Sequence, residues 1–147
     1  MSNLTVVDPS QDDPAPAGLE QGGKSEPPLA VVVEDDCLVR TAVSAYLEVL
    51  GCQVMAVGSA DDAEALLRSL VRRPRFMICD YGLPNGRNGL QVIATARQLL
   101  GETFSAFLLT GLVSRDVSRH CREIGVDLVF KPVSPGVLAT IVQRACS

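Results

Sequence analysis

Short apolar runs alternate with amphipathic segments over most of this chain. The runs are rich in Val, Ile, Leu and Phe and nearly continuous in apolar character, which is typical of strands covered on both faces. We predict strands at residues 29–33, 53–57, 76–79, 104–109 and 128–130. Each pair of strands is separated by a segment long enough for a crossover helix. The pattern therefore predicts an α/β fold: a doubly wound (βα)₅ unit with a five-stranded parallel sheet and right-handed crossovers.

The segments between the runs carry apolar residues at the three- and four-residue spacing of helices. Their ends carry residues suited to capping. Glycine favours helix C-termini, serine accepts hydrogen bonds from the first turn, and proline fits the first helical position. In chain order, the residues that predict helix boundaries are Gly51, Ser59 with Asp62, Gly101, Ser114, and Ser134 with Pro135.

The first 28 residues differ in composition from the rest, with five prolines and three glycines among mostly polar residues. Such a segment buries too little apolar surface to offset its chain entropy, so we predict a disordered Pro/Gly-rich tail over 1–28 and one domain over 29–147. The short apolar patch Leu4–Val7 leaves strand addition to a sheet edge open. Residues 18–25 match the phosphate-loop pattern GxxxxGK[ST], but no strand precedes them. Pro27 and Pro28 exclude the following helix, so we reject that reading.

Charge and cysteine usage narrow the function classes. The formal net charge is −4, which argues against a standing affinity for nucleic acid or an anionic membrane. The densest basic stretch, residues 68–75, is expected to be a solvated helix end, with a partner contact as the alternative. The chain shows no signal-peptide pattern, no apolar run of membrane-spanning length and no paired cysteine spacing, so we expect a cytoplasmic protein with reduced thiols. We expect His120 to be an exposed helix residue, and Cys37 and Cys79 to pack.

Four predicted strands end in groups suited to chemistry. The first runs into Glu34-Asp35-Asp36, the third into Asp80, the fourth into Thr110 and the fifth into Lys131. Ligands of open α/β sheets bind outside the carboxyl ends of the strands, so we expect these groups to meet at one edge. An acid cluster, a lone carboxylate, a hydroxyl and a lysine in that order indicate a magnesium-assisted phosphoryl acceptor site.

Four motifs carry a family resemblance. They are VVVEDD at 31–36, CDYGLPNGRNGL at 79–90, LLTG at 108–111 and VFKP at 129–132. With these motifs, residues 29–146 resemble the receiver domain of two-component response regulators, which has a flavodoxin-like fold. The resemblance implies that Asp80 accepts a phosphoryl group from a histidine kinase or phosphotransfer protein. It also implies a signalling protein that catalyses only its own phosphorylation and dephosphorylation.

The same resemblance implies a role for each site residue. Asp80 is the nucleophile and Asp35 a direct Mg²⁺ ligand, while Glu34 acts mainly through a bound water and the Gly82 backbone carbonyl supplies another oxygen. Lys131 pairs with Asp80 and then with a phosphoryl oxygen, and Thr110 donates a hydrogen bond to the phosphoryl group. In this family the peptide bond before Pro132 is usually cis.

The chain also departs from the commonest family pattern at three places. Glu34 stands where aspartate is common. The loop from Asp80 to Gly89 is one residue longer, with Gly86-Arg87 inserted as in receivers of hybrid kinases. Leu128 replaces the aromatic usually found three positions before the lysine, so position 128 carries no ring that could swing inward on activation.

Two other classes compete with the receiver reading. A haloacid-dehalogenase-like phosphotransferase would need a second aspartate where Gly82 stands, and a flavodoxin-like cofactor module would need a phosphate loop where residues 34–36 are acidic. Only 15 residues follow Pro132, so we expect no DNA-binding module. The output is then protein contact or a phosphorelay, with an unknown downstream target and a homodimer as a possibility.

Overall fold

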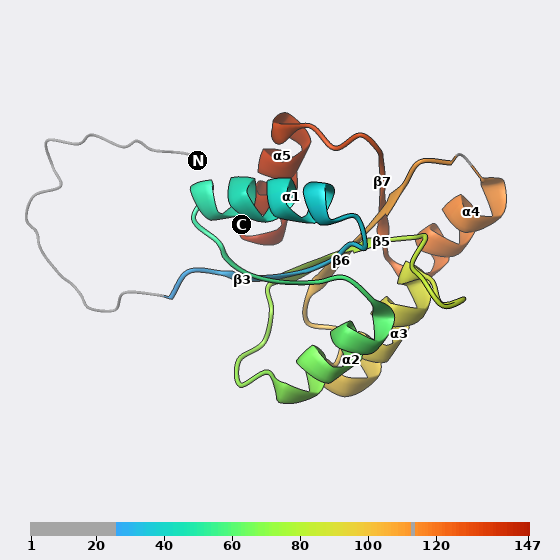
Figure 1. Cartoon of the computed structure of the whole chain (residues 1–147), viewed down its shortest axis with the longest axis horizontal. Coiled ribbons are helices and arrows are strands. Elements are labelled where there is room, and N and C mark those ends of the chain that lie inside the picture. The colour runs from blue at the N-terminus through green and yellow to red at the C-terminus, as the bar shows by residue number, and fades with distance from the viewer. Residues whose placement is uncertain (1–25, 113) are drawn as a thin grey trace, which may run out of the picture.

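Five parallel strands form one sheet in the computed structural model of the chain, which describes residues 26–112 and 114–147 (Figure 1). The strands are β3 (Leu29–Val33), β4 (Gln53–Val57), β5 (Phe76–Asp80), β6 (Ser105–Thr110) and β7 (Asp127–Phe130). They lie in the order β4-β3-β5-β6-β7, and every neighbouring pair is parallel. The predicted doubly wound α/β fold is confirmed.

Helices cover both faces of this sheet. They are α1 (Cys37–Val49), α2 (Ala60–Ser69), α3 (Gly89–Leu100), α4 (Arg115–Ile124) and α5 (Pro135–Ala145). The helices α1 and α5 lie on one face, and α2 and α3 on the other (Figure 1). No helix in the described ranges is both long and apolar enough to cross a membrane.

The predicted helix boundaries are confirmed by the capping contacts. The hydroxyls of Ser59, Ser114 and Ser134 each accept a hydrogen bond from the backbone N–H three residues on. Gly51 and Gly101 end their helices with positive φ angles of 97° and 82°. Two N-terminal caps escaped sequence analysis: Asp36 caps α1 and Asn88 caps α3.

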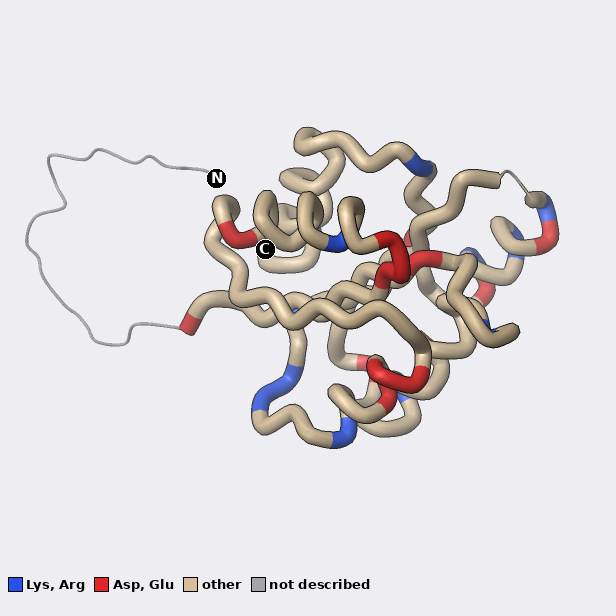
Figure 2. The backbone as a smooth tube through the Cα atoms, in the orientation of Figure 1, with Lys and Arg blue, Asp and Glu red and all other residues tan. Residues whose placement is uncertain are grey.

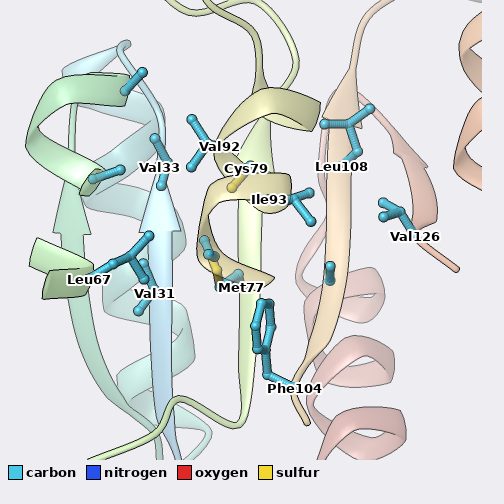
Figure 3. Close-up of a cluster of buried hydrophobic side chains, with 14 of the residues drawn as sticks. Val31, Val33, Leu67, Met77, Cys79, Val92, Ile93, Phe104, Leu108 and Val126 are labelled. Carbon is cyan, nitrogen blue, oxygen red and sulfur yellow. The ribbon is translucent and has the colours of Figure 1, made fainter. Parts of the chain in front are cut away.

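The core lies in two layers, one on each side of the sheet. Figure 3 shows the layer under α2 and α3, where Met77 and Cys79 of the central strand β5 pack in one cluster with Ile93 of α3. In the opposite layer the rings of Phe76 and Phe107 pack edge to face with centroids 6.3 Å apart. The strands β3 and β5 are buried along their whole length, but the edge strands β4 and β7 are partly exposed. Residues of each edge strand nevertheless pack in both layers, so the expected cover on both faces is confirmed, with partial exposure at the two edges.

The predicted tail falls largely outside the described residues, since the description starts at Glu26. The prolines at its end already contact the domain. The Pro28 carbonyl accepts a hydrogen bond from the Gln53 N–H at 2.9 Å, and the Pro27 carbonyl accepts one from Arg72 at 2.8 Å. The basic stretch 68–75 is thus not wholly solvated, because Arg72 binds the segment that leads into β3.

The five cysteines differ in burial: three are buried, Cys146 is half-buried and Cys37 is exposed. All five lie in the described ranges and all are free. Cys79 is buried as predicted, and burial raises the pKa of its thiol. The prediction that Cys37 packs was wrong, because it is the first residue of α1 and faces solvent. His120 is exposed, as predicted.

Candidate functional site

The sheet register brings the chemically suited strand ends to one edge. Val33 pairs with Cys79 across β3 and β5, so Glu34 and Asp80 follow side by side. Asp80 in turn pairs with Leu109 of β6, and the next residue, Thr110, pairs with Phe130 of β7. The Lys131 N–H donates a hydrogen bond to the Thr110 carbonyl at 2.9 Å. The predicted convergence at the carboxyl edge is therefore a direct result of the strand order.

Three carboxylates form the centre of this edge. Glu34, Asp35 and Asp80 each offer one oxygen, and these oxygens lie within 4.8 Å of one another. Glu34 is 1% exposed and Asp80 6%, whereas Asp35 faces solvent. Figure 2 shows the acidic positions after β3 in red near the end of β5. Carboxylates this close repel one another unless a proton or a cation intervenes.

Lys131 supplies positive charge to two of these carboxylates. Its Nζ lies 3.0 Å from Asp80 Oδ1 and 3.1 Å from Glu34 Oε1. The pairing with Asp80 is the one that the family resemblance implies, and the structure adds Glu34. Burial alone lowers the pKa of Lys131, but its pairing with Asp80 and Glu34 outweighs burial and the pKa is raised. The lysine is therefore held in its charged form.

Glu34 carries the strongest electrostatic perturbation at the site. Burial raises the pKa of its carboxyl from 4.5 to about 7, and the nearby charge of Asp80 acts in the same direction. The Asp36 N–H, which donates a hydrogen bond to Glu34 Oε2 at 3.1 Å, and the Lys131 ammonium oppose this shift only in part. Glu34 therefore exists partly protonated near neutral pH when no cation is bound.

The oxygen set fits a hard divalent cation. Glu34 Oε1 is buried and receives no directed hydrogen bond from the described residues, although Lys131 lies near it. Two further carboxylates converge with it, one of them open to water. Magnesium prefers such carboxylate oxygens and keeps some of its waters. Glu34, Asp35 and Asp80 could therefore hold Mg²⁺, which would relieve their mutual repulsion.

Asp36 and Gly82 lie next to the carboxylate cluster in sequence, but neither contributes a side chain to it. Asp36 Oδ1 accepts hydrogen bonds from the N–H groups of Leu38 and Val39 at 2.9 and 3.2 Å, so this carboxylate caps α1 and does not join the cluster. Gly82 lies in the exposed loop two residues after Asp80. Its carbonyl as a metal ligand remains a prediction.

Thr110 is buried at the site edge, and its hydroxyl is engaged. Its Oγ1 accepts a hydrogen bond from the Leu112 N–H at 3.1 Å and donates one to the Leu112 carbonyl at 3.2 Å. The hydroxyl therefore links β6 to the loop that precedes α4, and its contact with a phosphoryl group remains a prediction. The peptide bond between Lys131 and Pro132 is cis, as the resemblance implies.

Two supporting residues were missed by sequence analysis. Arg40 Nη1 donates a hydrogen bond to the Glu34 carbonyl at 2.7 Å and so braces the turn that carries the acid cluster. Gly89 packs so closely that a Cβ there would lie 2.4 Å from the Asp80 carbonyl oxygen. Its place in the CDYGLPNGRNGL motif was the only signal in the sequence, and the close approach itself is tertiary.

Comparisons with known proteins agree with this geometry. The protein-family model of the response regulator receiver domain matches residues 30–143 of the sequence. Transcriptional regulatory protein AruR of Pseudomonas aeruginosa is 31% identical over 119 residues, which cover 77% of this chain and 47% of AruR. The chain thus spans about half the length of this relative.

Solved structures show the same fold at lower identity. A CheY-like response regulator receiver domain protein from Methanospirillum hungatei JF-1 has a TM-score of 0.72 at 23% identity, over 82% of this chain and 94% of that one. Chemotaxis protein CheY4 of Vibrio cholerae has a TM-score of 0.72 at 22% identity, over 80% of this chain and 98% of that one. Together with the family match over nearly all of the domain, these findings show that the chain belongs to the response regulator receiver domain family.

Proposed function

We propose that this receiver takes a phosphoryl group onto Asp80, with Mg²⁺, from a phosphohistidine of a histidine kinase or phosphotransfer protein. One observation carries the proposal. Asp80 is a nearly buried carboxylate that shares a cluster with Glu34 and Asp35 while it pairs with Lys131 at 3.0 Å. A carboxylate cluster that can hold a cation, together with a fixed ammonium beside the acceptor carboxylate, is what phosphoryl transfer to an aspartate requires.

The chain's own residues would divide the work of the transfer. Lys131 contacts Asp80 Oδ1, which leaves Oδ2 to attack phosphorus. An oxygen–phosphorus bond forms as the phosphorus–nitrogen bond to the donor histidine breaks, and the imidazole nitrogen leaves with its electron pair. Mg²⁺, when bound, neutralises charge on the phosphoryl oxygens. Lys131 then turns to a phosphoryl oxygen. Later, water attacks phosphorus, the bond from Asp80 to phosphorus breaks, and inorganic phosphate leaves with the carboxylate restored.

Thr110 would connect the chemistry to the surface. Its hydroxyl must leave Leu112 to donate a hydrogen bond to the phosphoryl group, which frees the segment before α4. Beside that segment, Phe130 is 49% exposed and borders a groove of about 290 Å³. The groove is also lined by Ser114, Arg115, Ser118, Arg119 and Arg122. We propose this surface for phosphorylation-dependent contact with a downstream protein or with a second copy of the chain.

The output is proposed as protein contact or onward phosphotransfer in the cytoplasm. AruR is named as a transcriptional regulatory protein, but the match covers less than half of it. The matched domain, residues 30–143, carries 12 acidic and 11 basic residues, so its near-neutral charge gives it no standing attraction for DNA. A catalytic role towards a small substrate has no support at Gly82, where a haloacid-dehalogenase-like enzyme would carry its second aspartate.

Phosphorylation by a small donor tests the proposal. The full chain is incubated with acetyl phosphate and MgCl₂, and intact mass is measured before and after hydroxylamine. We expect one hydroxylamine-labile phosphoryl group on the parent and none on Asp80→Asn. Asp127→Asn removes an exposed carboxylate that pairs with Arg144 and should label like the parent. Full labelling of Asp80→Asn would refute the assignment. In a separate experiment, phosphotransfer from each histidine kinase to the parent protein would identify the donor.

A further inference from the structure

The loop between β5 and α3 is tied to α2 by one arginine. Arg87 Nη1 lies 3.1 Å from Asp61 Oδ1 and 3.5 Å from Glu64 Oε1, and both acids belong to the first turns of α2. The Arg87 side chain is 32% exposed, so it is packed between the two elements as well as paired. The loop is therefore anchored to a helix that contributes no residue to the acceptor site.

Glu64, one of the two acids that pair with Arg87, is held in its charged form. Glu64 also pairs with Arg68 at 2.9 Å. The hydrogen bond from Arg68 lowers the pKa of the Glu64 carboxyl first, and the one from Arg87 adds to it. Arg87, Asp61, Glu64 and Arg68 thus form a small network of alternating charges, which holds geometry better than an isolated surface pair.

The shape of the loop explains why this anchor matters. Gly82 and Asn88 face each other as an isolated bridge, and the Gly89 N–H donates to the Tyr81 carbonyl at 3.0 Å, so the loop has a narrow neck. Its tip, Pro84-Asn85-Gly86, is exposed and reverses direction through positive φ angles of 66° and 76°. Beyond the neck, the described contacts of the loop with the domain are the half-buried Leu83 and the ion pairs of Arg87.

The neck adjoins the acceptor carboxylate at both ends. Gly82 follows Asp80 by two residues, and Gly89 packs directly on the Asp80 carbonyl. Arg87 immediately precedes Asn88, which faces Gly82 and caps α3. A displacement at Arg87 is therefore passed to Gly82 through this bridge. Magnesium demands near-ideal octahedral geometry, so a small shift of a backbone carbonyl ligand weakens its binding.

We propose that Arg87 is a positioning residue for the acceptor site: through Asp61 and Glu64 it holds the loop so that the Gly82 carbonyl is presented to the cation. This inference rests on the proposed Mg²⁺-dependent phosphorylation of Asp80. The inserted Gly86-Arg87 pair thereby has a role in the chemistry without touching the phosphoryl group. Exposed ion pairs contribute about 0.2–1 kcal/mol each, so losing both predicts a fall in Mg²⁺ affinity of about two- to thirtyfold.

Calorimetric Mg²⁺ titration of the full chain tests this role. Arg87→Ala is compared with Arg87→Lys and with the charge swap Arg87→Asp/Asp61→Arg. The control Arg144→Ala removes another exposed pair, with Asp127 at 3.0 Å, far from the loop in sequence. We expect weaker Mg²⁺ binding and slower acetyl phosphate labelling for Arg87→Ala, partial recovery for the lysine and swapped variants, and parent behaviour for Arg144→Ala. Metal-free denaturation curves are measured for all.

The outcomes separate the inference from the function on which it rests. If the parent neither binds Mg²⁺ nor labels, the proposed function fails. If the parent does both and Arg87→Ala matches it in affinity and rate, the positioning role is overturned and the function stands. A loss of metal-free stability without a change in Mg²⁺ affinity also overturns it, since Arg87 would then serve only the fold.

Discussion

Replacing Glu34 with glutamine should change how the stability of the metal-free protein depends on pH. Glu34 is 1% exposed, and burial raises the pKa of its carboxyl from 4.5 to about 7. The folded state therefore binds this proton more tightly than the unfolded chain does. Linkage then requires that the free energy of unfolding falls as pH rises from about 4.5 through about 7, and levels off above that.

The size of the effect follows from the shift. A change from 4.5 to about 7 corresponds to at most about 3 kcal/mol. Lys131 shares the charge and is 29% exposed, so water screens part of it, and we expect about 1–3 kcal/mol. Glutamine offers one acceptor where Glu34 meets both the Asp36 N–H and Lys131. That mismatch costs about 1 kcal/mol at every pH, so the slope with pH is the informative quantity.

The assay is urea denaturation in EDTA at several pH values between 5 and 8. The parent should lose stability over this range relative to Glu34→Gln, because every other titrating group is common to the two proteins. Adding MgCl₂ should stabilise the parent more than the variant, with the largest difference at the highest pH. Parallel stability curves for the two proteins in EDTA would refute the reasoning.

Four further predictions concern other residues of the domain. Asp35→Asn should weaken Mg²⁺ binding more than Glu34→Gln in calorimetric titration, because a direct ligand costs more to lose than a water-bridged one; equal affinities would contradict this. Gly89→Ala should lose about 1–3 kcal/mol in urea denaturation, because its Cβ would lie 2.4 Å from the Asp80 carbonyl; parent stability would mean that the loop yields freely. Leu128→Tyr should be phosphorylated by acetyl phosphate at nearly the parent rate, but its partner affinity or self-association should change. NMR shifts of the parent protein, measured with and without beryllofluoride, would show whether α4 and β7 already change conformation with leucine at position 128. Deleting residues 1–25 should lower the free energy of unfolding by less than about 2 kcal/mol, and a loss above that limit would show that the tail docks on the domain. Deleting residues 1–28 should cost more than deleting 1–25, because it also removes the Pro27 and Pro28 contacts.

The fold and the location of the site could be predicted because both depend on local patterns. Val31 to Val33 and Met77 to Cys79 are apolar throughout, which is typical of strands covered on both faces, and Ser59, Ser114 and Ser134 mark helix starts through contacts three residues away. Parallel order then places every strand's carboxyl end at one edge. The convergence of Asp80 with its neighbours follows from that rule alone.

Distinctions between neighbouring residues required the tertiary structure. Asp35 and Asp36 are identical in type and adjacent in sequence, yet one joins the carboxylate cluster and the other caps α1, because the chain turns between them. The sequence drew attention to Leu128, whereas the exposed aromatic at this end of β7 is Phe130. Which side chain faces the groove beside α4 depends on how the edge strand β7 packs against that helix. The residue types of β7 alone do not determine this packing.

The sequence by itself determined the alternation of elements, the sheet type and the identity of the groups at the strand ends. Only the tertiary structure decided their electrostatics: Lys131 bridges Asp80 and Glu34, burial raises the pKa of Glu34 to about 7, and Arg87 anchors its loop on α2. Periodicity and capping act over a few residues and leave a trace in the order of residue types. Ion pairs and desolvation depend on distances between segments that are far apart along the chain, and those distances exist only once the sheet has formed.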